Sequence, residues 1–344
     1  MATPRTIINA ALRSIGITDA AATPDAPAFN DGIEAANLLL DTWSIQRLRA
    51  FDYDKIDFAL EAYRKSYTIG PSAVAGDPDG IGTGTASQTS IAITGAHSTL
   101  GASPATFDVP RQIVFNCVLD ESAKVFTVTG TDVLGNALVE VINGLTGVGV
   151  SGGRNVYGEK LFKTITTITC TALAGTVLVG SASLVNTARP NKVIDAFIRS
   201  SANADTPVLP TSRMRYNEKS DKFSVDTPSE YYYDHSYPNG VIFFYKTPSA
   251  ALRIYMDVWQ PFAQFAVTNY DTTVNLPNAY ARALKWNVAV ELAPEYGKDI
   301  PQIVAANAIS SQQMIDFLNS TPEKILKSTT PMDVVGGQPA INQR

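Results

Sequence analysis

The chain has 344 residues, of which 45% are hydrophobic and 17% are charged, and its formal net charge is −5. This length allows two or three domains, each with a hydrophobic core. The acidic balance excludes proteins that bind nucleic acid by neutralising phosphates with a basic face. No apolar run reaches membrane-spanning length, and the N-terminus has no signal-peptide core. We therefore expect no membrane contact and a protein that stays in the cytoplasm in which it is made.

The first 46 residues contain two predicted helices. Thr3 is a suitable N-cap before Pro4 at the first helical position, and Gly16 ends the helix. The second helix is predicted over residues 28–46. Both carry a one-sided apolar stripe, made in the first by Ile7, Ile8, Ala11, Leu12 and Ile15 and in the second by Phe29, Ile33, Ala36, Leu39, Leu40 and Trp43. One-sided helices need another helical layer to cover them.

The middle of the chain changes from helical to strand patterning. Residues 56–60 and 65–69 read as short strands, and a stretch rich in Gly, Pro and Ser follows them. Between about 89 and 184, short Thr- and Val-rich strands alternate with turn residues, which is typical of an antiparallel sandwich of roughly 100 residues. Cys117 and Cys170 lie in these strands and are expected to be free buried thiols, because a reducing compartment disfavours a disulfide.

Further strands are predicted after residue 187. Val193, Ala196 and Ile198 mark one of them, and residues 207–212 form another short extended piece. Residues 229–249 form a strong hairpin signal, because a Pro-Asn-Gly turn joins a tyrosine-rich strand to a second aromatic strand. Residues 252–258 alternate apolar and polar side chains as a half-buried strand does. The strands on either side of the inserted sandwich are expected to form one small antiparallel sheet.

A helical hairpin is predicted near the C-terminus. The first helix covers Leu276–Ile300, with Pro277 in its first turn and Gly297 as its C′ residue. The second runs from Pro301 to about Asn319, with an apolar stripe made by Ile303, Val304, Ala308, Met314, Ile315, Phe317 and Leu318. From Thr321 the periodicity ends, and the remaining residues read as an extended arm.

These elements predict an α+β fold. We expect the N- and C-terminal helix pairs to form a four-helix bundle, joined to the small antiparallel sheet. The core would comprise residues 1–70 and 187–320, the inserted Ig-like all-β sandwich residues 80–186, and the arm residues 321–344. Such an insertion is tolerated because loop-closure entropy grows only with the logarithm of length.

Residue types that carry chemistry are present without a converging pattern. The two histidines, His97 and His235, lie in turns, and no HExxH or CxxC spacing or phosphate-binding glycine loop is found. Acidic groups such as Asp52, Asp54 and Asp57, or Asp120 and Glu121, could serve as the carboxylate pair of a glycosidase, but they flank turns, where Asp is common. We therefore expect no enzyme activity, no cofactor and no metal.

Several stretches in this order resemble the head-to-tail adaptor, or connector, proteins of short-tailed bacteriophages (the podovirus type). The matching text is AALRSIGI at 10–17, LLLDTWSIQRL at 38–48, YTIG at 67–70, ARP at 188–190 with VIDAFIRS at 193–200, RMRYNEKSDKFSVDTPSEYYYD at 213–234, PNGVIFFYKTPS at 238–249 and the helix at 276–300. The inserted sandwich departs from the compact members of that family, so its role is not carried over.

The resemblance implies a structural virion protein at the head-tail junction. Its members form a ring, most often of 12 copies, which docks under the portal protein and receives the tail nozzle. Double-stranded DNA would pass through the ring without sequence-specific binding. Apart from the resemblance, the insertion could brace neighbouring subunits or contact the capsid or tail fibres. In this family a C-terminal arm enters the portal, and the corresponding apolar anchors here would be Ile325, Leu326, Met332, Val334, Val335 and Ile341.

Aromatic residues of the hairpin are the second candidate site. Tyr231, Tyr233, Phe243 and Tyr245, together with Trp259, are predicted to lie at an interface between subunits, because two-faced aromatic strands are more often buried than used to stack on sugars. Two alternatives remain open. The chain could be a tail-associated cell-wall glycosidase, or its inserted sandwich could bind carbohydrate on a host surface.

Overall fold

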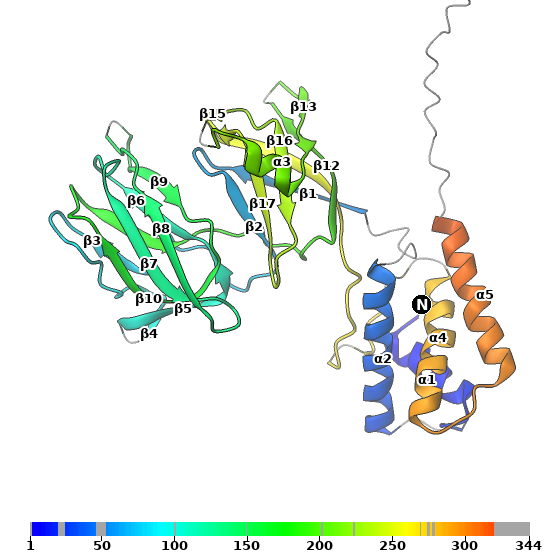
Figure 1. Cartoon of the computed structure of the whole chain (residues 1–344). Helices are drawn as coiled ribbons and strands as arrows, with labels where there is room; N and C mark the ends of the chain where they lie inside the picture. Colours follow the sequence, from blue (N-terminus) through cyan, green and yellow to red (C-terminus); the bar gives the residue numbers. More distant parts are fainter. Residues whose placement is uncertain are drawn as a thin grey trace, which may run out of the picture. The chain divides into compact units, whose positions relative to one another are not determined.

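The computed structural model of the protein describes residues 2–19, 25–45, 53–99, 101–148, 150–200, 202–222, 224–268, 270–273, 276 and 279–319. This part of the chain is α+β, with five α-helices and mostly antiparallel sheets (Figure 1). Contacts group it into two compact units, one from the ranges 1–35 and 270–344 and the other from residues 36–269. The predicted domain boundaries near residues 70, 80 and 186 thus all lie inside the second unit.

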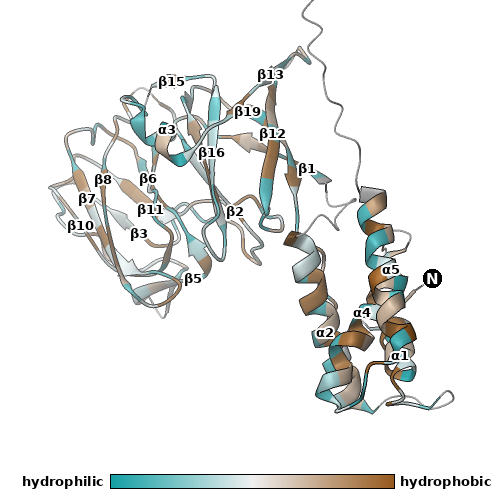
Figure 2. Ribbon diagram, turned by 45° about the vertical axis from the view of Figure 1, so that its right-hand side comes forward, coloured by the Kyte–Doolittle hydropathy of each residue, from teal (hydrophilic) through white to brown (hydrophobic). Residues whose placement is uncertain are grey.

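The first unit joins the two ends of the chain. Helix α1 (Pro4–Ser14) begins at Thr3, whose hydroxyl accepts a hydrogen bond from the Thr6 amide, as the sequence predicted. It packs against α4 (Tyr280–Glu295), which in turn packs against α5 (Gln302–Asn319), and the start of α2 (Ala26–Ile45) belongs to the same unit. Figure 2 shows hydrophobic bands along α2 and α4. A regular four-helix bundle stays a prediction.

The C-terminal hairpin differs in detail from its prediction. Helix α4 ends at Glu295 rather than Ile300, and Gly297, with φ +60°, follows its C-cap as a C′ residue, which is what the sequence indicated. Its predicted first turn at Pro277 lies outside the described residues. Helix α5 buries Val304, Ala308 and Ile315 but leaves Ile303, Met314 and Phe317 exposed. The single apolar stripe predicted for α5 is therefore wrong, because Ser311 completes the buried row while Ile303, Met314 and Phe317 face outwards.

The strands of the second unit outside the insertion form two main sheets rather than the single sheet that was predicted. One has the order β1-β19-β12-β13 and the other β14-β16-β17-β2. Their bounds are β1 Tyr53–Leu60, β2 Ser66–Ile69, β12 Lys192–Arg199, β13 Asp205–Pro207, β14 Leu209–Pro210, β16 Glu230–Asp234, β17 Gly240–Tyr245 and β19 Leu252–Trp259. A small pair of β15 (Val225–Asp226) and β18 (Thr247–Pro248) lies beside them.

Burial explains why there are two sheets. The inner faces of both contribute to one hydrophobic core, in which Ile254 and Met256 of β19 lie with Ile242 and Phe244 of β17. A single sheet would leave one of these apolar faces in water, whereas two sheets cover each other. Consequently β1 and β2, which are neighbours in sequence, pair with β19 and β17 instead of with each other.

The inserted residues form two further antiparallel sheets around a second core. Their strand orders are β4-β5-β10-β7-β8 and β3-β11-β6-β9. The bounds are β3 Gly82–Gly84, β4 Ser98–Thr99, β5 Ala102–Arg111, β6 Ile113–Cys117, β7 Val125–Thr131, β8 Ala137–Asn143, β9 Arg154–Tyr157, β10 Phe162–Cys170 and β11 Val177–Ser181. Phe115 of one sheet stacks on Phe126 of the other at 4.4 Å, and Cys117 and Cys170 are free and buried, as predicted. An Ig-like strand order stays a prediction.

Strand β5 and helix α3 are the longest of several elements that the sequence did not predict. Strand β5 contains Pro104 and Pro110, which argue against a strand in sequence; they are tolerated because β4, its partner on one side, is only two residues long. Helix α3 (Arg213–Glu218) is short, and its one signal in the sequence is the N-cap residue Ser212. The Ser212 hydroxyl accepts a hydrogen bond from the Arg215 amide at 3.3 Å.

Candidate functional site

The aromatic residues predicted to form one interface are divided between three places. Tyr231 and Tyr233 lie inside the core between the two main sheets, where Tyr231 is 2% exposed. The Tyr233 hydroxyl donates to the Pro190 carbonyl at 2.8 Å. These two side chains alternate along β16 with outward-facing ones, so the period-two geometry of the strand separates them. Both side chains are therefore buried against their own chain and are not exposed for contact with a neighbouring subunit.

Phe243 and Tyr245 lie on the outer face of that sheet and are half-buried. Phe243 and Tyr232, which are paired across β16 and β17, stack on each other and pack against the tilted ring of Tyr216 of α3, with ring centroids 5.8 to 6.0 Å apart. The Lys219 ammonium lies 4.4 Å from the ring of Tyr245 and pairs with Glu230 at 2.7 Å. Helix α3 thus covers part of this outer sheet face. The parts of Phe243 and Tyr245 that stay exposed are compatible with the predicted subunit interface, which remains a prediction.

Trp259 belongs to the outer face of the other main sheet. Lys192 lies over its ring at 5.0 Å. Further along this face Phe197 of β12 and Tyr255 of β19 stack at 5.3 Å, with the Arg199 guanidinium near both rings. Cross-strand charge pairs between β1 and β19 border these rings, namely Lys55 with Asp257 and Arg253 with Asp57. This aromatic and charged face is a second candidate assembly surface, which the sequence analysis recorded only at Trp259.

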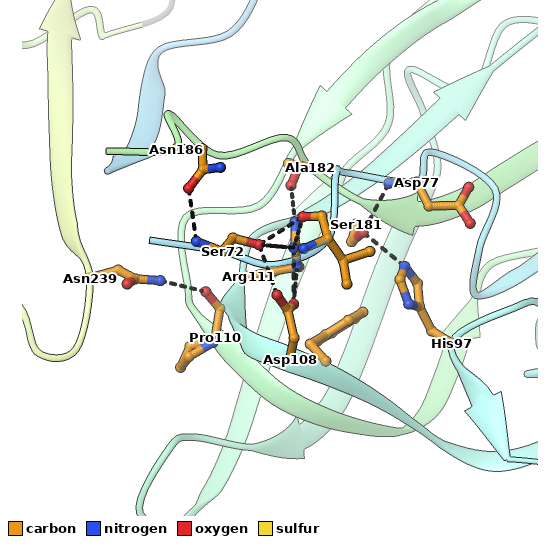
Figure 3. A network of polar contacts seen from close by, with 12 residues as sticks. Ser72, Asp77, His97, Asp108, Pro110, Arg111, Ser181, Ala182, Asn186 and Asn239 are labelled. Carbon is orange, nitrogen blue, oxygen red and sulfur yellow. Dashed lines mark hydrogen bonds and ion pairs between the residues drawn. The ribbon is translucent and has the colours of Figure 1, made fainter. Parts of the chain in front are cut away.

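A buried polar junction joins the insertion to the sheets (Figure 3). Arg111, at the end of β5, is 1% exposed and donates to the Asp108 carboxylate at 3.0 Å, to the Ser72 hydroxyl at 2.7 Å and to the Val74 carbonyl at 2.6 Å. The Ser72 amide donates to Asn186 at 3.0 Å, so the segments entering and leaving the insertion are tied together. Burial opposes ionisation of Asp108, but the hydrogen bonds from Ser72 and Arg111 prevail and lower its pKa.

A second buried arginine makes the same kind of link. Arg64 is 1% exposed and donates to Glu61 at 3.1 Å and to the Ser183 carbonyl at 2.7 Å. Its guanidinium also lies over the rings of Tyr67 and Tyr157, at 4.3 and 4.8 Å. Because each arginine has carboxylate and carbonyl partners from both sides of the junction, the insertion is fixed to the sheets rather than merely tethered to them.

The residues considered for catalysis have structural partners. His97 Nε2 lies 2.9 Å from the Ser181 hydroxyl, but Ser181 is fully buried and its hydroxyl also accepts from the Asp77 amide. Glu121 is fully buried and accepts from the amides of Ala174 and Gly175, at 2.9 and 2.8 Å. His235 Nε2 donates to the Asn191 carbonyl at 3.1 Å.

Within the ranges that the structure describes, no three His, Cys, Asp or Glu side chains gather as metal ligands, and no helix is long and apolar enough to cross a bilayer. Asp52 and all six predicted arm anchors, from Ile325 to Ile341, lie outside the described residues.

Comparison with known families decides the class. The family model described as "SU10 adaptor protein" matches residues 138–334, which is more than half of the chain. The chain belongs to the SU10 adaptor protein family. The matched range holds the motifs quoted between residues 188 and 300, whereas those between 10 and 70 lie before it. This membership makes the chain a structural adaptor protein of a bacteriophage, and it agrees with the predicted adaptor class at that level.

Other comparisons add little. No curated protein matches the chain. A mutant VP2 protein of infectious bursal disease virus in derived T=1 particles is 8% identical, with a TM-score of 0.14 over 83% of this chain and 56% of that one. A structure of the Gx strain of that virus is 10% identical, with a TM-score of 0.12 over 77% of this chain and 53% of that one. The chain thus spans just over half the length of these viral chains, and such TM-scores carry no argument.

Proposed function

We propose that this SU10 adaptor family member forms a ring at the head-tail junction, docks under the portal protein, extends the DNA channel and gives the tail its attachment platform. The observation that carries the proposal is the family match over residues 138–334. A ring, most often of 12 copies, follows from the resemblance to the adaptors of short-tailed phages. In this reading the protein binds other proteins, catalyses no reaction and uses no cofactor, and DNA passes through without sequence-specific contacts.

The helical unit supports such a role by its surface. Ile303, Met314 and Phe317 of α5 are large apolar side chains that are 71%, 48% and 79% exposed. Exposed apolar groups on one helix are typical of surfaces that a partner covers. We propose that residues 321–344, which follow α5 in the sequence, enter the portal as an arm that orders on binding.

Electron microscopy of the purified protein mixed with the portal protein of the same phage tests this function. We expect an added ring of density under the portal. A variant lacking residues 321–344 should keep its circular dichroism spectrum but lose docking, whereas a variant with those residues in scrambled order controls for length. Docking that survives the deletion would rule out the arm, and a protein that assembles on no portal would rule out the adaptor function.

A further inference from the structure

A pocket of about 510 Å³ lies in the second unit, between the inserted sheets and the turn that follows β1. Glu61, Tyr63, Asn116, Gly153, Arg154 and Tyr157 are among the residues that line it. Its volume falls in the range of pockets that hold small ligands or a protein side chain. The pocket belongs to neither of the assembly surfaces described above.

Arg154 is the unusual residue of this pocket. Its guanidinium lies 4.2 Å from the ring centroid of Tyr63. Its Nε atom is buried and has no hydrogen-bond partner among the described residues, and no ion pair between described residues involves this side chain. Buried donors are normally satisfied, so an acceptor from outside the chain would complete this site.

Four other side chains of the pocket are joined in a chain of hydrogen bonds. Asn116 donates to Asn155 at 2.8 Å, Asn155 donates to the Tyr157 hydroxyl at 3.0 Å, and Tyr157 donates to Glu61. Glu61 is the other charged residue of the lining, and Arg64 neutralises it at 3.1 Å. Arg154 therefore supplies the one uncompensated charge among the lining residues.

The backbone holds Tyr63 in place under Arg154. Tyr63 has φ +65°, a left-handed conformation that costs energy for a residue with a side chain. Its amide donates to the Pro248 carbonyl at 2.9 Å, and the Arg64 amide donates back to Glu61 at 3.2 Å, which fixes the turn. The ring thus presents a fixed surface on which the guanidinium can stack while its donors stay available.

We propose that this pocket binds the carboxylate of an Asp or Glu side chain presented by a partner protein, with Arg154 as its anchor. A guanidinium fork matches a carboxylate with two parallel hydrogen bonds. A sugar would need several free donors and acceptors, but the amides of Asn116 and Asn155 are engaged with each other and with Tyr157. One face of Tyr63 is also taken by Arg154. Single-anion recognition is the chemistry that remains.

Arginine-specific modification by phenylglyoxal, followed site by site by mass spectrometry, tests the proposal on the full chain. The probes are N-acetylglutamate N-methylamide, the matching glutamine compound, and glucuronate. We expect the glutamate probe to slow modification of Arg154 about tenfold near ten times its Kd, as single-site occupancy requires. The glutamine compound should not protect at the same concentration.

Arg199 is an internal control in the same sample. It also lies against aromatic rings, but its guanidinium is held by Asp205 through two hydrogen bonds of 2.7 and 2.8 Å. Its modification should not respond to the glutamate probe. By calorimetry, Arg154→Gln should abolish binding of this probe, while Arg199→Gln keeps it.

Equal protection of Arg154 by the glutamate and glutamine probes, or no protection by either, would overturn the proposal. Protection by glucuronate at lower concentration than by the glutamate probe would also overturn it, in favour of an acidic sugar. The experiment uses the free chain without portal, so its failure would not count against the proposed adaptor function.

Discussion

Single buried charges decide how the insertion is held. Arg64 and Arg111 are both 1% exposed, and each bridges the junction between the inserted sheets and the rest of the second unit. In the sequence, both arginines lie in polar segments close to predicted turns, where an arginine side chain is ordinarily exposed to solvent. Nothing local distinguishes them, because their carbonyl partners at Ser183 and Val74 come from other parts of the chain. Their buried, bridging role can be recognised only in the folded structure, which brings the distant acceptors together.

His97 gives a prediction at the same scale. Burial lowers the pKa of His97 below its usual 6.5, and the neighbouring Arg111 acts in the same direction, against the opposing charges of Asp77 and Asp108. Because the unfolded histidine takes up a proton at higher pH than the folded one, stability is present above pH 6.5 and is lost as pH falls through the folded pKa.

We therefore expect the denaturation midpoint of the wild type to fall between pH 7 and pH 5 by more than that of His97→Gln. Urea unfolding followed by circular dichroism at several pH values measures the difference. His235→Gln, which replaces the other histidine at an exposed position, shows whether the effect belongs to His97. Parallel pH profiles for wild type and His97→Gln would contradict the expectation.

Among the elements, long periodic segments were predicted well. The bounds of α1, α2 and α5 agree with the sequence to within a few residues, and the hairpin of β16 and β17 forms as its Pro-Asn-Gly turn indicated. What failed was the assignment of faces and partners. On α5, apolar residues on two faces of the helix were interpreted as one stripe. Strands β1 and β2 were assigned to one sheet, although they pair with β19 and β17 in two different sheets.

Helix packing in the first unit provides a prediction for α2. A Cβ atom added at Gly32 would lie 2.4 Å from Cγ2 of Ile8, so α1 and α2 approach each other closely there. Alanine is the better helix former, but the steric clash should outweigh its propensity. We expect Gly32→Ala to destabilise the protein by about 1–3 kcal/mol, the usual cost of overpacking.

Chemical denaturation of the single variants and of Gly32→Ala with Ile8→Ala measures this effect. Because Ile8→Ala removes the methyl group that the new Cβ would meet, the double variant should lose less stability than the sum of the two single variants. Strict additivity, or a more stable Gly32→Ala protein, would show that the helices do not meet at this glycine.

At the scale of the whole molecule, the described residues of the second unit form two separate hydrophobic cores. One holds residues of the insertion from Ile81 to Val179, and the other holds residues from β1 and β2 and from β12 onwards. The chain enters and leaves the insertion at one place, since the Gly70 amide donates to the Val185 carbonyl at 3.1 Å. A segment with adjacent ends and its own hydrophobic core requires few contacts with the rest of the chain in order to fold.

We expect a fragment of residues 71–187 to fold alone, with cooperative thermal unfolding and a dispersed amide NMR spectrum. Its stability should be lower than in the full chain, because Gln112 and Pro110 lose their partners Ser66 and Asn239. Tyr157 likewise loses Glu61. A fragment without a cooperative transition would mean that the core between the sheets is required for the insertion to fold.

The amino-acid sequence by itself determined the four long helices, most strands and the adaptor class, because these depend on local periodicity, capping and short motifs. Only the tertiary structure decided that β1 and β2 belong to different sheets and that Tyr231 and Tyr233 are internal. It also decided that Arg64 and Arg111 are buried, whereas the Arg154 Nε atom has no hydrogen-bond partner among the described residues. The physical reason is that burial and hydrogen-bond satisfaction depend on groups far apart in the chain, which a local pattern does not contain.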